Sequence, residues 1–213
     1  MAKEKSKNLA IFIAVAVVLV LATGFLTYSY TLNQSSSSQE NTLNFFKEYS
    51  IALNNIHVAS GLDVEANLNL DAGNSYTETE EYYYEFAIPY YDTGKEQVLD
   101  AKELLNKAKS KLQNLQSNAP NSFFQSDVED RIEQVDALIS VSNDLYSLLD
   151  YQKQQLYEVN YGSESKATEY NNKYNALVPE FNNRLKKLSE IQNRIDLNWD
   201  QDWYPTFQEE ATT

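Results

Sequence analysis

Residues 98–115 read VLDAKELLNKAKSKLQNL, and this stretch decides the expected fold. Its apolar residues recur with a strict alternation of three and four, at Val98, Ala101, Leu105, Ala108, Leu112 and Leu115. Because an α-helix has about 3.6 residues per turn, this spacing places them in one stripe, the seam by which helices pack in coiled coils and bundles. Residues 118–121, which read NAPN, are expected to end the helix.

Two helical segments are expected upstream. Residues 42–70 carry a stripe of three-four spacing, made by Phe46, Tyr49, Leu53, Ile56 and Ala59. Residues 71–75 read DAGNS, which predicts a turn. A second segment begins near Thr77, and Pro89 is expected to kink or break it, because proline lacks a backbone donor and restricts the residue before it. Residues 92–94, DTG, are a candidate new cap.

A third helix is expected over residues 126–161. Its apolar stripe is formed by Val128, Ile132, Val135, Ile139, Tyr146 and Leu149. Ser126 or Asp127 is the expected amino-terminal cap, and Gly162 suits a left-handed helix end.

The fourth helix is expected over residues 164–199. Pro179 lies within its apolar stripe, which keeps its phase across the proline, so we predict one kinked helix rather than two. Pro205 marks the expected end, and residues 206–213 are expected to fray.

The fold class predicted from these segments is all-α. The 213 residues include only five Gly and four Pro, too few for the turns of a β-sandwich or barrel of this size. Because the loops between the long helices are short, neighbouring helices should be antiparallel. We therefore predict an up-down-up-down four-helix bundle over residues 42–205.

The amino-terminal region carries the strongest single signal. Residues 9–26 read LAIFIAVAVVLVLATGFL, and no charge occurs between Lys7 and Glu40. A helix over residues 9–30 would be long enough to cross a bilayer of about 30 Å. Lys3, Lys5 and Lys7 precede it, so residues 1–8 are expected to be cytoplasmic. The remainder is then extracytoplasmic, at the cell membrane, beginning with a Ser-rich tether at 31–41.

A cleaved secretory signal is the alternative interpretation, with Ala22-Thr23-Gly24 as a small-residue cleavage site. The apolar run continues past this point, which favours retention. Asn33 begins the only N-x-S/T sequon, so glycosylation there is an open question. The chain has no cysteine, which excludes a disulfide framework.

The composition argues against nucleic acid as a partner. The net charge is −14, and the first 30 residues hold three Lys against one Glu, so the remainder is more acidic still. An acidic surface repels phosphate backbones and anionic headgroups. The expected partners are the bilayer, through residues 9–30, and a membrane or extracytoplasmic protein.

Two aromatic groups are candidate binding surfaces. Tyrosines interleave with glutamates near the expected helix start at Thr77, and Tyr side chains suit contact surfaces. The candidate partner or ligand surface comprises Tyr82, Tyr83, Tyr84, Phe86, Tyr90 and Tyr91. In the expected topology the 118–124 connection and the carboxy-terminal end both lie near the bilayer. The candidate membrane-proximal aromatics there are Phe123, Phe124, Trp199, Trp203 and Tyr204.

Signatures of catalysis are weak, so we expect neither an enzyme nor a cofactor. Residues 196–202 alternate oxygen side chains as calcium loops do, but Gln201 stands where the turn needs Gly. His57 is the only histidine, and no cysteine accompanies it as a metal ligand. Residues 129–136 place three acids on one helix face without the histidines of a di-iron bundle, so we interpret that face as solvated.

The leading functional hypothesis is a non-catalytic scaffold or accessory subunit that acts through protein contacts. The alternative is a ligand-binding or sensory bundle with a Tyr-rich pocket that passes its signal to a partner. In layout alone the outer domain resembles the helical sensor domains of chemoreceptors, although the expected cytoplasmic tail is too short for a signalling module.

Overall fold

The computed structural model describes residues 36–77 and 84–199. Within these ranges the chain is all-α, as its periodicity predicts: α2 spans Ser36–Thr77, α3 Tyr84–Leu115, α4 Ser122–Tyr161 and α5 Glu164–Asn198, with a short 3-10 helix, η2, at Gln116–Asn118. The expected anchor at 9–30 and the tail at 206–213 lie outside the described residues. None of the helices that are described is long and apolar enough to span a bilayer.

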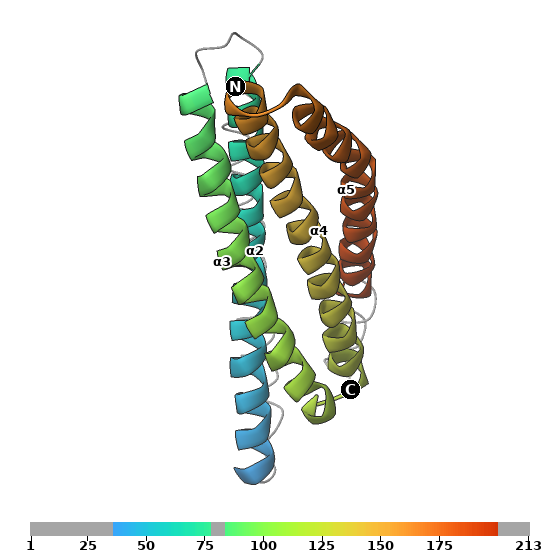
Figure 1. Ribbon diagram of the computed structural model, residues 1–213. Helices are drawn as coiled ribbons and strands as arrows, with labels where there is room; N and C mark the ends of the chain where they lie inside the picture. Colours follow the sequence, from blue (N-terminus) through green and yellow to red (C-terminus); the bar gives the residue numbers. More distant parts are fainter. Residues whose placement is uncertain (1–35, 78–83, 200–213) are drawn as a thin grey trace, which may run out of the picture.

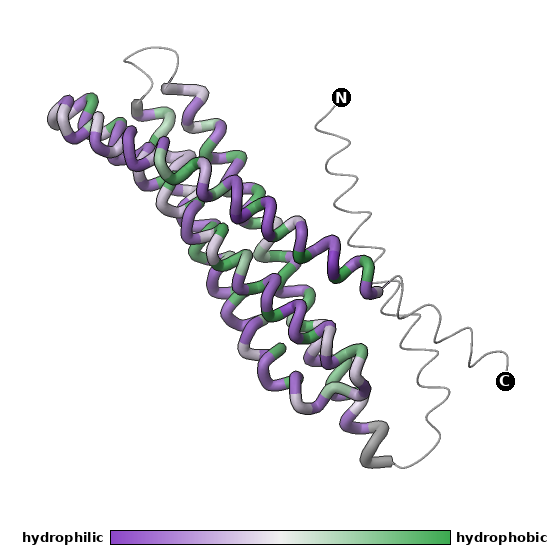
Figure 2. Tube along the Cα trace, turned by 90° about the vertical axis from the view of Figure 1, so that its right-hand side faces the viewer, coloured by the Kyte–Doolittle hydropathy of each residue, from purple (hydrophilic) through white to green (hydrophobic). Residues whose placement is uncertain are grey.

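Successive helices run in opposite directions (Figure 1). α2 packs against α3, α3 against α4 and α4 against α5, with a smaller contact between α2 and α4. Ion pairs of Lys95 with Asp150 and of Lys153 with Asp92, both 2.5 Å, align α3 with α4. α5 packs mainly on α4, and in Figure 2 it crosses the front of the molecule as a largely hydrophilic helix.

The buried side chains form two clusters along the bundle. One lies at the end where α2 and α4 begin and α5 ends, which we call the Trp199 end; its largest fully buried members are Phe45, Tyr49, Leu105, Leu112, Phe124 and Val128. The other lies toward the end where α3 and α5 begin, which we call the hairpin end; it includes Leu70, Tyr91, Val98, Leu145, Leu149 and Phe181. Burial of these apolar faces stabilises the bundle without disulfides.

The turn expected at residues 71–75 is wrong, because α2 continues through it to Thr77. Gly73 serves packing instead of turning the chain: a Cβ at this position would lie 2.4 Å from Cε1 of Tyr91. Within the helix the Ser75 hydroxyl donates to the Asp71 carbonyl at 2.8 Å, whereas Asn74 accepts the Tyr91 hydroxyl of α3. α2 also begins earlier than expected, at Ser36.

Of the kink or break expected at Pro89, the break is wrong, because α3 contains this proline and continues to Leu115. Pro89 lies in the second turn of α3, so it forfeits the i→i−4 hydrogen bond that an N–H at this position would donate to the Glu85 carbonyl. The residues assigned to a new cap make contacts between helices. Asp92 pairs with Lys153, and a Cβ at Gly94 would lie 2.9 Å from a methyl group of Leu149.

The two ends of α4 differ from the prediction, the first in its capping residue and the second in its backbone conformation. Asn121, rather than Ser126 or Asp127, is the amino-terminal cap, and its side chain accepts the Phe124 N–H at 3.0 Å. Gly162 follows α4 as expected, but its φ of −118° is not left-handed. A Cβ at this position would overlap the Glu158 carboxylate, the far end of a flexible side chain.

α5 confirms the prediction of one helix across Pro179. Ser163 caps its start by accepting the Lys166 N–H. Figure 1 shows α5 as a curved helix beside α4, and the helix ends at Asn198.

Candidate functional site

Aromatic rings from three helices meet at the Trp199 end. Phe124 of α4 stacks edge-to-face with Phe46 of α2, with ring centroids 4.9 Å apart. Trp199 lies against Phe123 at 5.1 Å and Phe124 at 6.0 Å, both edge-to-face. Phe124 is buried, whereas Phe123 and Trp199 are half-buried. Three of the predicted membrane-proximal aromatics are thus adjacent and lie at the end where α2 begins, while Trp203 and Tyr204 are outside the described residues.

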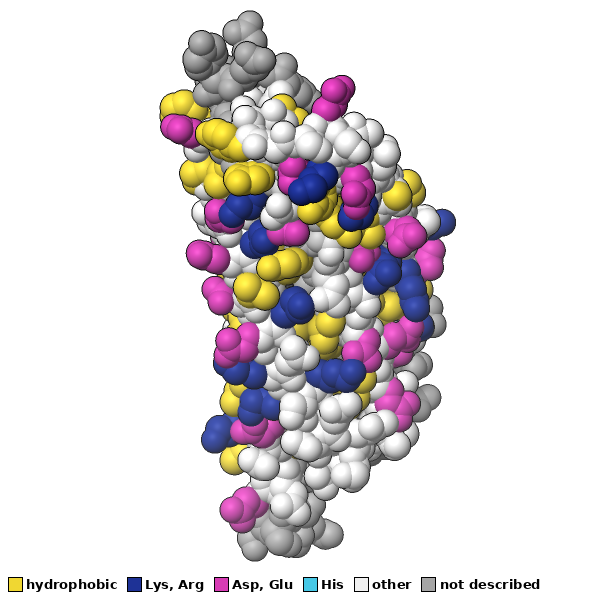
Figure 3. Space-filling model, in the orientation of Figure 1, with side chains coloured by type: hydrophobic (Ala, Val, Ile, Leu, Met, Phe, Trp, Pro, Cys, Tyr) yellow, Lys and Arg dark blue, Asp and Glu magenta, His cyan; other side chains and the backbone are white. Residues whose placement is uncertain are grey.

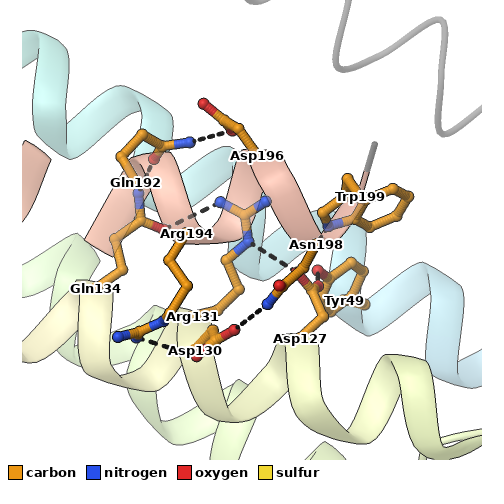
Figure 4. Close-up of polar contacts among 10 residues, drawn as sticks. All are labelled: Tyr49, Asp127, Asp130, Arg131, Gln134, Gln192, Arg194, Asp196, Asn198 and Trp199. Atoms are coloured by element: carbon orange, nitrogen blue, oxygen red, sulfur yellow. Dashed lines mark hydrogen bonds and ion pairs between the residues drawn. The ribbon is translucent and has the colours of Figure 1, made fainter. Parts of the chain in front are cut away.

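Asp127 lies beneath this aromatic cluster and joins three helices (Figure 4). One of its carboxylate oxygens accepts the Tyr49 hydroxyl of α2, and the other accepts the Trp199 indole N–H at 2.7 Å. Arg131 lies on the same side, with Nε 3.6 Å from the carboxylate. Burial raises the pKa of Asp127, while Arg131 and the indole oppose that shift.

A second polar layer, outside Asp127, fastens the end of α5 to α4 (Figure 4). Asp130 accepts Asn198 Nδ2 at 3.0 Å and pairs with Arg194 at 3.0 Å. Arg194 also pairs with Glu133 at 2.5 Å, and Gln134 donates to Gln192 across the same helix interface at 2.5 Å.

The three acids of the face over residues 129–136 are exposed, in agreement with the predicted solvated face, and each also contacts a side chain of another segment. Glu133 binds Arg194 of α5 and Asp136 binds Lys109 of α3 at 2.6 Å, while Glu129 accepts Gln116 at 3.1 Å. Among the residues the structure describes, no group of three His, Cys, Asp or Glu could hold a metal ion. The arrangement at this end positions helices through paired polar groups.

Large aromatic side chains are exposed at the hairpin end. Tyr76 of α2 stacks on both Phe86 and Tyr90 of α3, with ring centroids 6.3 and 5.5 Å apart. Phe86 is 60% exposed. The end of α4 adds Tyr157, Val159 and Tyr161, which are 50, 63 and 65% exposed. We call these six residues the hairpin-end surface, and Figure 3 shows hydrophobic side chains gathered there, over the start of α3.

The predicted tyrosine surface maps onto this end in part. Phe86 and Tyr90 belong to it, Tyr84 is the first residue of α3, and Tyr82 and Tyr83 are outside the described residues. Tyr91 is fully buried, so its assignment to a surface is wrong. Its hydroxyl donates to Asn74 at 2.9 Å, and burial raises its pKa. Alternation along a helix explains the difference, since neighbouring residues point about 100° apart.

A buried carboxylate separates the two core clusters. Asp63 of α2 is 7% exposed and accepts the Ser142 hydroxyl of α4 at 2.7 Å. Its other oxygen has no hydrogen-bond partner among the described residues. Burial raises the pKa of Asp63 to about 6, and the Ser142 hydrogen bond only partly offsets this effect.

Two surface pockets of about 300 Å³ lie along α5. One is lined by α2, α4 and α5 residues, namely Ser60, Gln134, Leu138, Leu185, Leu188, Ser189, Gln192 and Asn193. The other lies between the end of α4 and the start of α5. Neither of these two pockets is lined by the described residues of the predicted tyrosine surface.

The sequence interpretation missed the buried acids as a class. The sequence assigns Asp127 only as a candidate cap, with Ser126 as the alternative, and gives Asp63 and Asp144 no role. Asp144 lies 3.0 Å from Arg184 of α5, and burial raises its pKa. A signal did exist for Asp63, because it occupies an in-phase position between Ala59 and Ala66 of the apolar stripe.

Comparison with known proteins identifies no relative: no protein-family model, no curated protein and no solved structure matches this chain.

Proposed function

We propose that this chain is a single-pass, membrane-anchored, extracytoplasmic helical bundle that binds another protein through its hairpin-end surface. It acts as a scaffold or accessory subunit and performs no catalysis. The observation that carries the proposal is the exposure of Phe86, Tyr157 and Tyr161, which are each at least half exposed and come from two helices that meet at one end. Clustered exposed aromatics are typical of protein contact sites, because they bury large areas at low entropic cost.

The proposed anchor agrees with this placement. Residues 9–30 precede α2, which begins at the Trp199 end. α2 has 42 residues, so at about 1.5 Å per residue it is about 63 Å long. A bundle standing on the membrane would therefore hold the hairpin-end surface about 60 Å away from it, within reach of a partner's outer domain. Phe123 and Trp199 would then lie near the headgroups, as proposed for the membrane-proximal aromatics.

Site-specific photo-crosslinking in native membranes tests the contact. A photoreactive amino acid at position 157 of the full-length chain is expected to yield one discrete heterologous adduct. The matched control is position 187, an exposed lysine on α5. An additional Phe86→Ala and Tyr161→Ala change should reduce the adduct at least about tenfold, as expected when contact residues worth more than about 1 kcal/mol each are removed.

Equal adducts from positions 157 and 187, or an adduct at 157 that survives both alanine changes, would contradict the proposal. Circular dichroism of the variants is the control for folding, because these side chains are exposed and their removal should leave the helix content unchanged.

A further inference from the structure

A pocket opens between the middle of α5 and α2, although polar contacts join the two helices near both ends of the bundle. At the hairpin end, Asn74 of α2 donates to the Tyr174 hydroxyl of α5 at 3.4 Å. At the Trp199 end, Tyr49 of α2 and Trp199 of α5 donate to the same carboxylate. Between these points α5 is curved (Figure 1), and the pocket of about 300 Å³ lies there, bounded at both ends.

The wall of this pocket is uncharged and partly apolar. Leu138 of α4 and Leu185 and Leu188 of α5 supply its apolar part, and Ser60 of α2 belongs to its polar part. The Ser60 hydroxyl donates its proton to the Ile56 carbonyl at 2.9 Å, so its oxygen is left to accept a further hydrogen bond. A ligand that suits this wall has an apolar body and a hydrogen-bond donor.

A buried carboxylate lies one helical turn from the wall. Asp63 follows Ser60 by three residues on α2, and residues at that spacing are neighbours on a helix surface, with Cβ atoms about 5–6 Å apart. The Ser142 hydroxyl, which donates to Asp63, also lies 3.0 Å from the carbonyl oxygen of Leu138, another wall residue. Asp63 is therefore adjacent to the pocket through both α2 and α4.

The carboxylate of Asp63 lacks a partner of opposite charge. One of its oxygens has no hydrogen-bond partner among the described residues, and the other shares the single Ser142 proton with the Leu138 carbonyl. No charged group of the described residues offsets the carboxylate. An uncompensated charge among apolar side chains destabilises a fold, and a perturbed acid next to a cleft is a candidate for a functional site.

We propose that the pocket between α2, α4 and α5 binds a small primary amine, whose ammonium group pairs with Asp63 and whose apolar body packs on the three leucines. A cation within about 4–6 Å of a carboxylate stabilises its ionised form, and Ser60 of the wall is at such a distance from Asp63. The ammonium group supplies donors to both residues. A volume of about 300 Å³ is at the lower end of the range for small-molecule sites, so the ligand is compact.

The second pocket along α5 does not share this unmet charge. Glu158, the more buried of its two carboxylates, accepts the Ser163 N–H at 3.0 Å and lies 3.5 Å from the Lys166 ammonium group. A ligand amine there would have to displace a lysine that the chain already supplies. The pocket next to Asp63 is therefore the one that calls for an external cation.

Thermal unfolding of the full-length chain in mild detergent tests the site, with benzylamine as the probe. An amine of this size is expected to bind with a Kd of about 1 mM. At about 10 mM and near neutral pH it should raise the melting temperature, Tm, by about 3–5 °C in differential scanning calorimetry. Benzyl alcohol has the same ring without the charge and should raise Tm by less than about 1 °C.

Two variants separate the carboxylate from the pocket. Asp63→Asn removes the charge, and Ser189→Phe fills the pocket from an exposed position of its wall. Each is expected to weaken benzylamine binding at least about tenfold, which reduces the Tm shift about threefold. The matched control Asn183→Phe, at an exposed position of α5 outside the pocket wall, should keep the wild-type shift.

The absence of a benzylamine shift in the wild-type chain, or an equal shift with benzyl alcohol, would overturn the proposal. A full shift in Asp63→Asn or in Ser189→Phe would overturn it as well, because the amine would then bind without the carboxylate or outside the pocket. A single cooperative transition in each variant is the control for folding. The pocket is separate from the hairpin-end surface, so a failure of partner crosslinking at position 157 leaves this proposal standing, and the reverse also holds.

Discussion

Replacing Asp127 with alanine is expected to lower the free energy of unfolding by about 3–5 kcal/mol, the range seen when one partner of a buried charged network is removed. The carboxylate accepts hydrogen bonds from Tyr49 of α2 and Trp199 of α5 while belonging to α4 itself. Its loss leaves the buried Tyr49 hydroxyl without this acceptor, and an orphaned buried polar group costs about 1–3 kcal/mol. Urea unfolding of the full-length chain in mild detergent, followed by far-UV circular dichroism, measures the effect.

A double-mutant cycle separates the network from simple loss of packing. Tyr49→Phe removes one donor, so the combined Tyr49→Phe and Asp127→Ala variant should be less destabilised than the sum of the two single variants. Glu129→Ala, an exposed acid on the same helix, is the control and should change stability by at most about 0.5 kcal/mol. An Asp127→Ala variant as stable as the control, or strict additivity in the cycle, would show that Asp127 does not join the helices.

Replacing Asp63 with asparagine is expected to stabilise the protein near neutral pH. Burial raises the pKa of Asp63 from 3.8 to about 6. At about 1.4 kcal/mol per unit, ionised Asp63 therefore costs the folded state about 3 kcal/mol above that pKa. Asparagine keeps an acceptor for the Ser142 hydroxyl. Its amide group replaces the Asp63 oxygen that has no hydrogen-bond partner, and leaving that buried N–H unpaired costs about 1 kcal/mol or more. The expected net gain is about 1–2 kcal/mol.

The pH dependence gives a second readout with a definite sign. Because the folded state holds this proton more tightly than the unfolded chain, the stabilising contribution is complete below about pH 4 and is lost as the pH rises through about 6. Burial raises the pKa values of Asp127 and Asp144 too, so these groups act in the same direction. Wild-type stability should therefore rise when the pH is lowered from about 7 to about 5, and Asp63→Asn should flatten this slope.

Parallel urea titrations at the two pH values measure that slope. Asp71→Asn, an exposed change on the same helix, is the matched control and should keep it. An Asp63→Asn variant that is less stable near neutral pH and keeps the wild-type slope would show that Asp63 is ionised at no cost in the folded state.

The periodicity of apolar residues was sufficient to predict the helices but not their ends. Apolar spacing reports a helix over many residues, so α3 after Val98 and the continuity of α5 across Pro179 follow from it. The errors at Gly73 and Gly94 share one cause. Each glycine reads locally as a turn, whereas the structure uses it to admit a large side chain from a neighbouring helix, which a single sequence does not show.

The candidate sites were predictable to a similar degree. Clusters of aromatic residues in the sequence indicated both ends of the bundle, because Tyr and Trp are unusually frequent in those segments. Phe86 is exposed and Tyr91 is buried because they lie on different sides of the same helix. The role of Asp127 depends on which side chains of α2 and α5 lie next to it. Such long-range partners are not encoded in local pattern.

The display of the bundle outside the cell on residues 9–30 is the central claim, and thiol labelling in intact cells tests it most directly. In the cysteine-free full-length chain, Ser110→Cys lies on an exposed position of α3 and Ser6→Cys precedes the apolar run. We predict that a membrane-impermeant maleimide labels Ser110→Cys on cells that keep the protein in their membranes, and labels Ser6→Cys only after permeabilisation. Labelling of Ser6→Cys on intact cells, protection of Ser110→Cys, or release of a shortened chain into the medium would contradict the account.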